Sequence, residues 1–258
     1  MERDTVSLCC HAVPGIPLIQ AGDDLAAMFS AALTASDLTP REGDILVVAQ
    51  KVVSKAEGRL VRLDEVMITD EARRLAEECE KDPRLVTLIL AESQSVMRVR
   101  PGLIIVRHRL GFVMANAGID QSNVATSEGG EVALLLPEDP DESCRRLRAA
   151  LEGRFGCRLG VIMSDSIGRA WRLGNVGQAI GVAGPAAVRD LRGREDLHGR
   201  PLAVTETGFA DEIAAAAGLL MGQADEGMPL VLLRGLDWDA CDQSALASVR
   251  PLDTDLFP

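Results

Sequence analysis

The first recognisable pattern in the chain is helical and lies near the N-terminus. Apolar side chains recur there at the i, i+3, i+4, i+7 and i+8 spacing of one helix face, and Asp23 or Asp24 can cap the first turn. That face consists of Leu25, Met28, Phe29, Ala32 and Leu33. Two more helices are predicted over residues 69–81 and 83–93, where an Asp-Pro pair supplies a cap and a first-turn proline.

Apolar runs of another kind predict strands. Residues 45–53 are apolar on both faces and rich in β-branched side chains, which indicates a buried strand, followed by a polar loop over 54–58. Residues 96–100 and 103–107 flank a Pro-Gly pair and are predicted to form a hairpin.

The remaining elements follow in a mixed order. We expect a strand over 111–115, a helix over 140–154, a strand over 158–163, an irregular glycine-rich stretch over 174–193, a helix over about 208–221 and a strand over 229–234. Because strands and helices do not alternate regularly, the predicted fold class is α+β rather than doubly wound α/β. We expect a single domain over residues 1–258, with room for two subdomains.

Composition and charge exclude several kinds of partner. The net charge of −12 disfavours non-specific binding to nucleic acid or to an anionic membrane, because both need a cationic face. The six cysteines form no Cys-x-x-Cys pair, which is typical of a reduced intracellular protein. No signal peptide and no membrane-spanning apolar run is visible, so we expect a cytoplasmic protein with no membrane partner.

Two polar segments follow apolar runs and suggest a metal site. Residues 115–123 place Asp120 among a hydroxyl and three carboxamides, and residues 161–169 place Asp165 beside Ser166. An aspartate in a loop is often only a helix cap or part of an Asx turn. Two such strand-end aspartates with neighbouring hydroxyls nevertheless predict a shared divalent cation.

Cationic side chains near these segments suggest that the metal serves phosphate chemistry. Lys51 and Lys55 lie four residues apart at the end of the predicted strand and would suit a polyphosphate, although solvated surface lysines are an alternative. Arg169 and Arg172 bracket Trp171 and could clamp an anionic substrate or merely stack on the indole. Neither a P-loop nor a Rossmann glycine fingerprint is present.

Five short blocks then occur in a distinctive order. They are Gly15-Ile16-Pro17-Leu18, Gln50-Lys51 with residues 54–58, residues 115–123, Ser164-Asp165-Ser166 with Arg169 and Trp171-Arg172, and residues 222–229. In this order they resemble the coenzyme F420-0:L-glutamate ligases, a family of F420 gamma-glutamyl ligases. The similarity extends from about residue 13 to about residue 236.

The resemblance implies a GTP-dependent ligase that joins L-glutamate to the lactyl carboxylate of coenzyme F420-0, by way of an acyl phosphate, and adds further glutamates through gamma-links. It also implies a family-specific α+β mixed-sheet ligase fold in an intertwined homodimer. Two Mn²⁺ or Mg²⁺ ions are expected, and K⁺ in some members. Some members carry a C-terminal nitroreductase-like domain, which we do not expect in this chain.

The resemblance also assigns roles to individual residues. The implied metal ligands are Asp120, Asp165, Ser166 and Gln223. The implied nucleotide contacts are Gly15, Ile16, Pro17, Leu18, Gln50, Lys51, Lys55, Asn123, Met221, Gly222, Gln223, Ala224, Asp225, Glu226, Gly227 and Met228. Asp120, Asp165 and Lys55 are the expected catalytic residues, and Arg169, Trp171 and Arg172 are expected to bind substrate.

The chain departs from the family in one block. Ser166, Ile167 and Ala170 stand where the family usually has Thr, Phe and Pro. Serine keeps the hydroxyl, but the other two changes alter the expected wall of the acceptor pocket. Two other interpretations therefore remain open: a ligase of the same fold acting on a different phosphate-bearing acceptor, and a non-catalytic GTP-binding regulatory protein.

Overall fold

The computed structural model describes residues 6–122, 124 and 130–255. A mixed five-stranded sheet forms its centre, with the strands in the order β1-β12-β2-β8-β9. The strands are β1 (Cys9–Ala12), β12 (Leu230–Arg234), β2 (Ile45–Ala49), β8 (Gly160–Arg169) and β9 (Arg172–Ala183). Only β2 and β8 pair in parallel; the other neighbours are antiparallel. This mixed sheet with its helices confirms the predicted α+β class.

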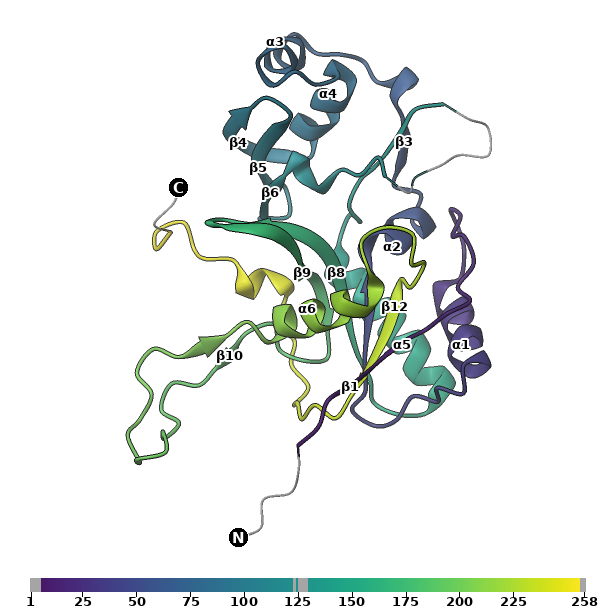
Figure 1. Cartoon of the computed structure of the whole chain (residues 1–258), viewed down its shortest axis with the longest axis vertical. Helices are drawn as coiled ribbons and strands as arrows, with labels where there is room; N and C mark the ends of the chain where they lie inside the picture. The colour runs from purple at the N-terminus through teal and green to yellow at the C-terminus, as the bar shows by residue number, and fades with distance from the viewer. Residues whose placement is uncertain (1–5, 123, 125–129, 256–258) are drawn as a thin grey trace.

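Helices cover both faces of this sheet (Figure 1). Helix α6 (Phe209–Met221) packs on β9, β12 and β1, while α5 (Pro140–Phe155) packs on β8 and β9 and also contacts α1 (Leu25–Ala35). The strands and helices enclose one continuous apolar core, which includes the fully buried side chains of Phe29 and Ile162. Burial of that apolar surface is the main stabilising contribution.

A smaller layer lies above the sheet in Figure 1 and has its own apolar cluster. It contains helices α3 (Asp70–Cys79) and α4 (Pro83–Ala91), the antiparallel sheet β4 (Ser93–Arg100), β5 (Leu103–His108) and β6 (Val113–Ala115), and the pair β3 (Leu60–Arg62) and β7 (Val132–Leu134). Short 3-10 turns occur at Leu63–Glu65, Asn116–Gly118 and Ala245–Ser248.

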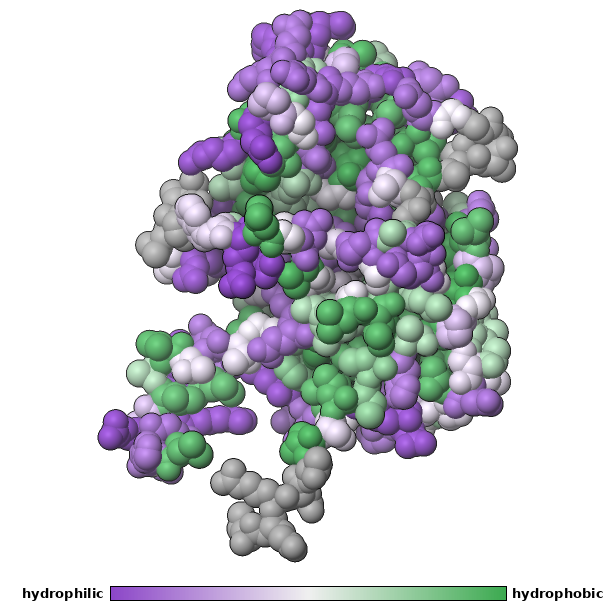
Figure 2. All heavy atoms as spheres, in the orientation of Figure 1, coloured by the Kyte–Doolittle hydropathy of each residue, from purple (hydrophilic) through white to green (hydrophobic). Residues whose placement is uncertain are grey.

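A thin two-stranded ribbon projects from the body in Figure 1. It contains β10 (Arg189–Asp190) and β11 (Glu206–Thr207), and the loop between them leaves Leu197 92% and Val204 83% exposed. Figure 2 shows apolar side chains on this ribbon and a second apolar patch over α6, where Leu219 is 85% exposed. In the described part of the chain, no helix combines the length and apolar character needed to cross a bilayer.

Several predicted elements are confirmed with their caps. Helix α1 begins after Asp24, whose carboxylate accepts a hydrogen bond from Ala27 N at 2.9 Å. Helix α4 begins at Pro83 after the capping side chain of Asp82, as its Asp-Pro pair predicts. Helices α3, α5 and α6, strand β12 and the β4–β5 hairpin also lie where the pattern places them.

The predicted strand over 45–53 is wrong in its second half. Strand β2 ends at Ala49, and helix α2 (Gln50–Ala56) follows at once, so residues 54–56 are helical rather than a polar loop. The β-branched pair Val52 and Val53 favours a strand on propensity alone. Tertiary packing overrides that preference, because a helix turns Val53 into the core, where it is only 4% exposed.

The glycine-rich stretch is also different from the prediction. The first half of it, residues 174–183, belongs to β9, the antiparallel partner of β8, and β8 itself continues past residue 163 to Arg169. A Cβ atom at Gly177 would lie 2.5 Å from the carbonyl oxygen of Ala214 on α6, and one at Gly181 would lie 2.5 Å from that of Pro140 on α5. These glycines therefore allow close packing of helices on a strand and do not mark a loop.

Candidate functional site

A cavity of about 570 Å³ opens where β2 ends, beside the middle of β8 and the turn after α6. This volume is within the range of small-molecule sites in proteins. Four separate segments of the chain line the cavity, together with Gly177 and Gly218: residues 16–19, helix α2 with the residue before it, residues 164–166 of β8, and residues 221–229. Of the residues implied by the family resemblance, those lining it are Ile16, Pro17, Leu18, Gln50, Lys51, Lys55, Asp165, Ser166, Met221, Gly222, Gln223, Ala224, Asp225, Glu226, Gly227 and Met228.

A few predicted site residues lie elsewhere. Gly15 adjoins the lining segment, and Asn123 falls outside the described residues. Arg169, Trp171 and Arg172 lie at the tip of the β8–β9 hairpin and do not line the cavity. Trp171 is 85% exposed there, so substrate binding by this tip stays a prediction.

Helix α2 explains how two lysines reach the same cavity. Lys51 and Lys55 are four residues apart, so they lie on one face of the helix. Burial lowers the pKa of Lys55, the nearby charge of Lys51 lowers it further, and the carboxylate of Asp120 partly opposes both effects. Two cations crowded at one wall of a cavity form a favourable place for a polyanion.

Asp120 is held beside this wall by its backbone and by its side chain. Its backbone exchanges two hydrogen bonds with Leu134, at 3.0 and 2.8 Å. Its carboxylate lies 3.0 Å from the ammonium group of Lys51 and accepts a hydrogen bond from the hydroxyl of Ser122 at 3.0 Å. Asp120 does not itself line the cavity, but Lys51 links its carboxylate to the cavity wall.

Asp165 reaches the cavity from β8 and carries the most perturbed carboxylate of the site. Burial raises its pKa to about 6, and the charge of Asp120 contributes to the rise; the hydrogen bond from Ser166 N and the charge of Lys51 oppose it. The electrostatic effect of Asp120 on Asp165 agrees with the prediction that the two aspartates lie close together. The positive charge near Asp165 is therefore too small to offset the cost of burying its ionised carboxylate.

The residues around Asp165 fit a hard divalent cation. They supply carboxylates from Asp120 and Asp165, the hydroxyl of Ser166 and the amide oxygen of Gln223, all donors that Mg²⁺ and Mn²⁺ accept. Within the described ranges no group of three or more His, Cys, Asp or Glu side chains forms a complete metal site. Water and phosphate oxygens would complete the shell, which is the usual arrangement for Mg²⁺ at phosphate sites.

The turn over residues 222–227 depends on glycine. Glu226 accepts a hydrogen bond from Ala224 N at 2.8 Å, which folds its carboxylate back over the turn. Gly222 has φ of +71°, and a Cβ atom there would lie 2.0 Å from the carboxylate carbon of Glu226. The backbone conformation and this close approach together require glycine at position 222.

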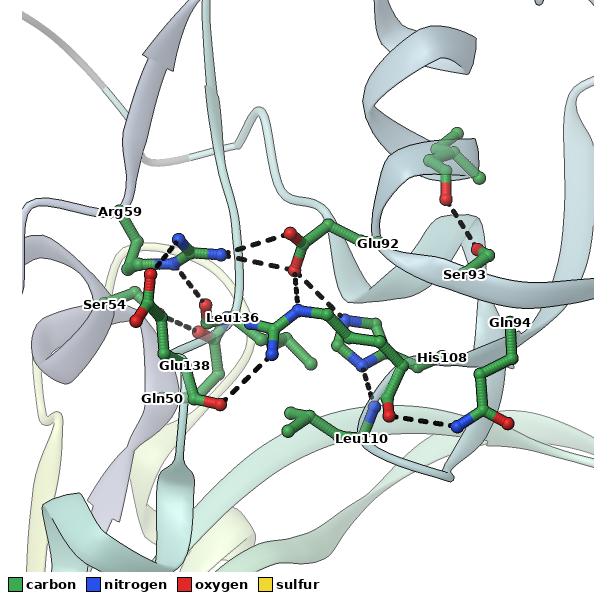
Figure 3. A network of polar contacts seen from close by, with 12 residues as sticks. Gln50, Ser54, Arg59, Glu92, Ser93, Gln94, His108, Leu110, Leu136 and Glu138 are labelled. Carbon is green, nitrogen blue, oxygen red and sulfur yellow. Dashed lines mark hydrogen bonds and ion pairs between the residues drawn. The ribbon is translucent and has the colours of Figure 1, made fainter.

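Sequence reasoning missed other parts of the site. Ser164, Gly177 and Gly218 also line the cavity. In the sequence, only Ser164 carries a signal for this position, because it adjoins Asp165. A partly buried ionic network around Glu92 was missed as well. Figure 3 shows Glu92 between Arg59 and the His108 side chain, which come from separate elements.

Comparisons with known proteins identify relatives along most of the chain. The profile of the F420-0:Gamma-glutamyl ligase family matches residues 15–235. A protein of Methanothermobacter thermautotrophicus is 45% identical over 95% of this chain and 96% of its own length, and one of Methanopyrus kandleri is 47% identical over 84% and 83%. A protein of Archaeoglobus fulgidus is 46% identical over 87% and 86%. All three are named Coenzyme F420:L-glutamate ligase.

The extent of these matches is sufficient to assign the chain to a class of enzyme and to a family. Similarity of this extent to three ligases makes the chain an enzyme of the ligase class. It belongs to the F420-0:gamma-glutamyl ligase family, as its ordered motif blocks predict.

Proposed function

We propose that this ligase forms the amide between L-glutamate and the lactyl carboxylate of coenzyme F420-0, with GTP as the energy source. The observation that supports this most is the cavity that places Asp165 beside Lys51 and Lys55. Activating a carboxylate needs a phosphoryl donor, and such a donor needs neutralisation of its negative charge. The names of the relatives supply the two substrates.

The proposed reaction has two balanced steps. A carboxylate oxygen of F420-0 attacks the γ-phosphorus of GTP, which forms an acyl phosphate and releases GDP. The amine of glutamate then attacks the acyl carbon, loses a proton, and releases inorganic phosphate with the former carboxylate oxygen. Positioning and electrostatics do the catalytic work, so the enzyme itself needs no covalent nucleophile.

The residues of the site have distinct roles in this proposal. Lys51 and Lys55 bind and orient the phosphates, while residues 16–18 and 221–228 enclose the nucleotide. Asp120, Asp165, Ser166 and Gln223 would hold Mn²⁺ or Mg²⁺ ions, which supply charge neutralisation at the γ-phosphate. Further gamma-linked glutamates and a requirement for K⁺ belong to the proposal through the family resemblance alone.

The direct test is incubation with F420-0, L-glutamate, GTP and Mn²⁺, followed by mass spectrometry. The proposal requires a product heavier by one glutamyl residue, formed together with stoichiometric GDP. Turnover with another phosphate-bearing carboxylate but not with F420-0 would show a ligase of different acceptor. GTP binding without any turnover would point to the regulatory alternative.

Lys55→Ala is expected to weaken GTP binding by about ten- to a hundredfold. Loss of one charge-assisted hydrogen bond costs roughly 1.5–3 kcal/mol, which corresponds to that change in affinity. Lys55→Arg should restore the affinity only in part, because a planar guanidinium does not replace a compact ammonium on a short helix. Calorimetric titration of GTP into both variants checks this, and wild-type affinity in Lys55→Ala would identify an ordinary surface lysine.

We also propose that the chain forms a homodimer. The projecting β10–β11 ribbon exposes Leu197 and Val204, and a ribbon of this kind can be stabilised by packing against a second copy. An obligate interface would bury more than about 2,000 Å² in total. Light scattering should therefore give twice the chain mass at micromolar concentration, whereas a stable monomer would refute the dimer.

A further inference from the structure

A second cavity, of about 220 Å³, lies beside strands β8 and β9 and the start of α6. It is enclosed by β5 and β6, the β8–β9 hairpin, the start of α6 and the C-terminal segment. It shares no lining residue with the large cavity. Gln178 nevertheless lines it, and Gln178 is paired directly with Asp165 across the hairpin. Directly opposed residues of an antiparallel pair project from the same face, so this cavity adjoins the proposed metal site.

The main polar group of this cavity is a buried arginine. Arg107 is only 9% exposed, yet its guanidinium donates no hydrogen bond within the described part of the chain. A guanidinium carries five donors, and buried charges are normally both paired and hydrogen-bonded. Its nearest anion is the carboxylate of Asp255, at 3.6 Å, which is too long for a hydrogen bond. The site therefore has the capacity to bind a carboxylate more closely than it binds Asp255.

An acidic group faces the same cavity and provides the opposite charge. Asp211, in the first turn of α6, accepts a hydrogen bond from Ala179 N at 2.8 Å through Oδ1. Its other oxygen, Oδ2, has no hydrogen-bond partner among the described residues. Burial raises the pKa of this carboxyl group, so a bound cation would be favourable there. A primary ammonium group fits this requirement.

A second cation lies at the edge of the cavity. Arg250 lines it and is exposed, so a second carboxylate could be bound there at lower desolvation cost. Two cationic groups, Arg107 and Arg250, and two anionic groups, Asp211 and Asp255, line the cavity of about 220 Å³. With Asp255 displaced, the remaining groups complement two carboxylates and one ammonium. That set of charges is the one carried by an α-amino dicarboxylate.

We propose that this second cavity binds the L-glutamate substrate, with Arg107 on a carboxylate and Asp211 on the ammonium group. The assignment rests on the proposed function, because it identifies the cavity with the amine donor of that reaction. Its position beside Gln178 and Asp165 would bring the donor next to the activated carboxylate. In the free protein the carboxylate of Asp255 holds the place of the ligand carboxylate.

The C-terminal segment therefore competes with the amino acid. This segment runs past β9 toward the smaller layer in Figure 1, and Ser248, Arg250 and Asp255 all line the cavity. Removing the charge of Asp255 should relieve the competition, whereas removing the charge of Arg107 should abolish the site. The two variants are thus expected to act in opposite directions.

The test is calorimetric titration of L-glutamate into the full chain, with 2-oxoglutarate as a probe that lacks the ammonium group. Arg107→Gln should weaken binding of both compounds by about ten- to a hundredfold. Arg100→Gln, an exposed arginine on the neighbouring strand, is the matched control and should bind as wild type does. Asp211→Asn should weaken binding of L-glutamate alone, and Asp255→Asn should tighten binding of both.

Three outcomes would overturn the inference: no saturable glutamate binding to the wild-type chain, unchanged affinity in Arg107→Gln, or weaker binding in Asp255→Asn. Should Arg107→Gln fail to fold, Arg107→Lys and Asp255→Asn carry the same test. A ligation assay would distinguish failure of this cavity assignment from failure of the proposed function. A chain that ligates glutamate with an unchanged KM in Arg107→Gln would refute only the cavity assignment, and Arg107-dependent glutamate binding without ligation would refute only the reaction.

Discussion

Replacing Asp165 with asparagine is expected to reduce ligation by roughly a hundredfold or more and, at the same time, to stabilise the metal-free protein. In the proposed reaction, activity should fall because the neutral amide would be a poorer metal ligand and would supply no charge to hold a cation at the γ-phosphate. Stability should rise because burial and the charge of Asp120 disfavour an ionised Asp165. Asparagine keeps an oxygen that can accept the hydrogen bond from Ser166 N.

The pH dependence gives this prediction a definite sign. The folded-state pKa of Asp165 is about 6, whereas its ordinary value is 3.8. The contribution of this group to stability is therefore complete below about pH 3.8 and is lost as the pH rises through about 6. In metal-free protein the stability advantage of Asp165→Asn should grow across this range and then remain constant.

The check is thermal unfolding in the presence of a chelator, measured from about pH 4 to about pH 7.5. This range covers most of the interval over which the protonation of Asp165 changes. Asp242→Asn, which changes an exposed carboxylate outside the cavity, is a suitable control and should alter neither turnover nor stability. Full turnover in Asp165→Asn would refute the proposed metal site at Asp165. Loss of turnover together with lower metal-free stability would show that Asp165 acts only as a structural residue.

The second large effect is expected at Glu92, at the junction of the two apolar clusters. Its carboxylate lies 3.2 Å from Arg59 and 2.9 Å from Arg109, with the His108 side chain 3.5 Å away (Figure 3). Arg59 also donates a hydrogen bond to the carbonyl oxygen of Leu136 at 2.8 Å. The network thus joins the end of α4, the end of β5 and the end of α2.

Glu92→Gln is expected to lower the free energy of unfolding by about 3 kcal/mol, near the low end for breaking a buried ion pair. The reason is that two arginines would lose their common counter-charge. For a chain of this size that corresponds to roughly 6–12 °C in the unfolding temperature. Glu138→Gln is a matched control, because Glu138 also pairs with Arg59 but is 77% exposed. Its effect should stay below about 1 kcal/mol.

The pH dependence of Glu92 has the opposite sign to that of Asp165. Burial alone would raise the pKa of Glu92, but His108, Arg109 and Arg59 together lower it to about 2 from an ordinary 4.5. Its stabilising contribution is therefore present above about pH 4.5 and is lost as the pH falls toward 2. The difference in stability between wild type and Glu92→Gln should shrink over that range. Equal stability at neutral pH would show that the network contributes nothing.

Local signals in the sequence predicted those parts of the fold that depend on neighbouring residues. The capped helix after Asp24 and the Asp-Pro start of α4 are determined within one or two turns, so their positions follow from the sequence. Helix α2 could not be predicted in this way. Its Val52–Val53 pair favours a strand locally, and only packing against the completed sheet favours the helix.

The site could be predicted in its chemistry but not in its arrangement. Asp120, Asp165 and the two lysines carry recognisable chemistry, and their order resembles one family. Their meeting in space depends on the parallel pairing of β2 with β8, which no local pattern reveals. The Glu92 network and the Arg107 cavity depend on contacts between distant segments as well, so they became visible only in the structure.

Transfer of ¹⁸O from the F420-0 carboxylate tests most directly whether GTP activates that group. F420-0 labelled in both carboxylate oxygens is incubated with L-glutamate, GTP and Mn²⁺, and the released phosphate is analysed by mass spectrometry. Activation through an acyl phosphate predicts one ¹⁸O atom in the phosphate and one in the amide product. Unlabelled phosphate formed alongside GDP would contradict it, because GTP would then be hydrolysed without activating the carboxylate.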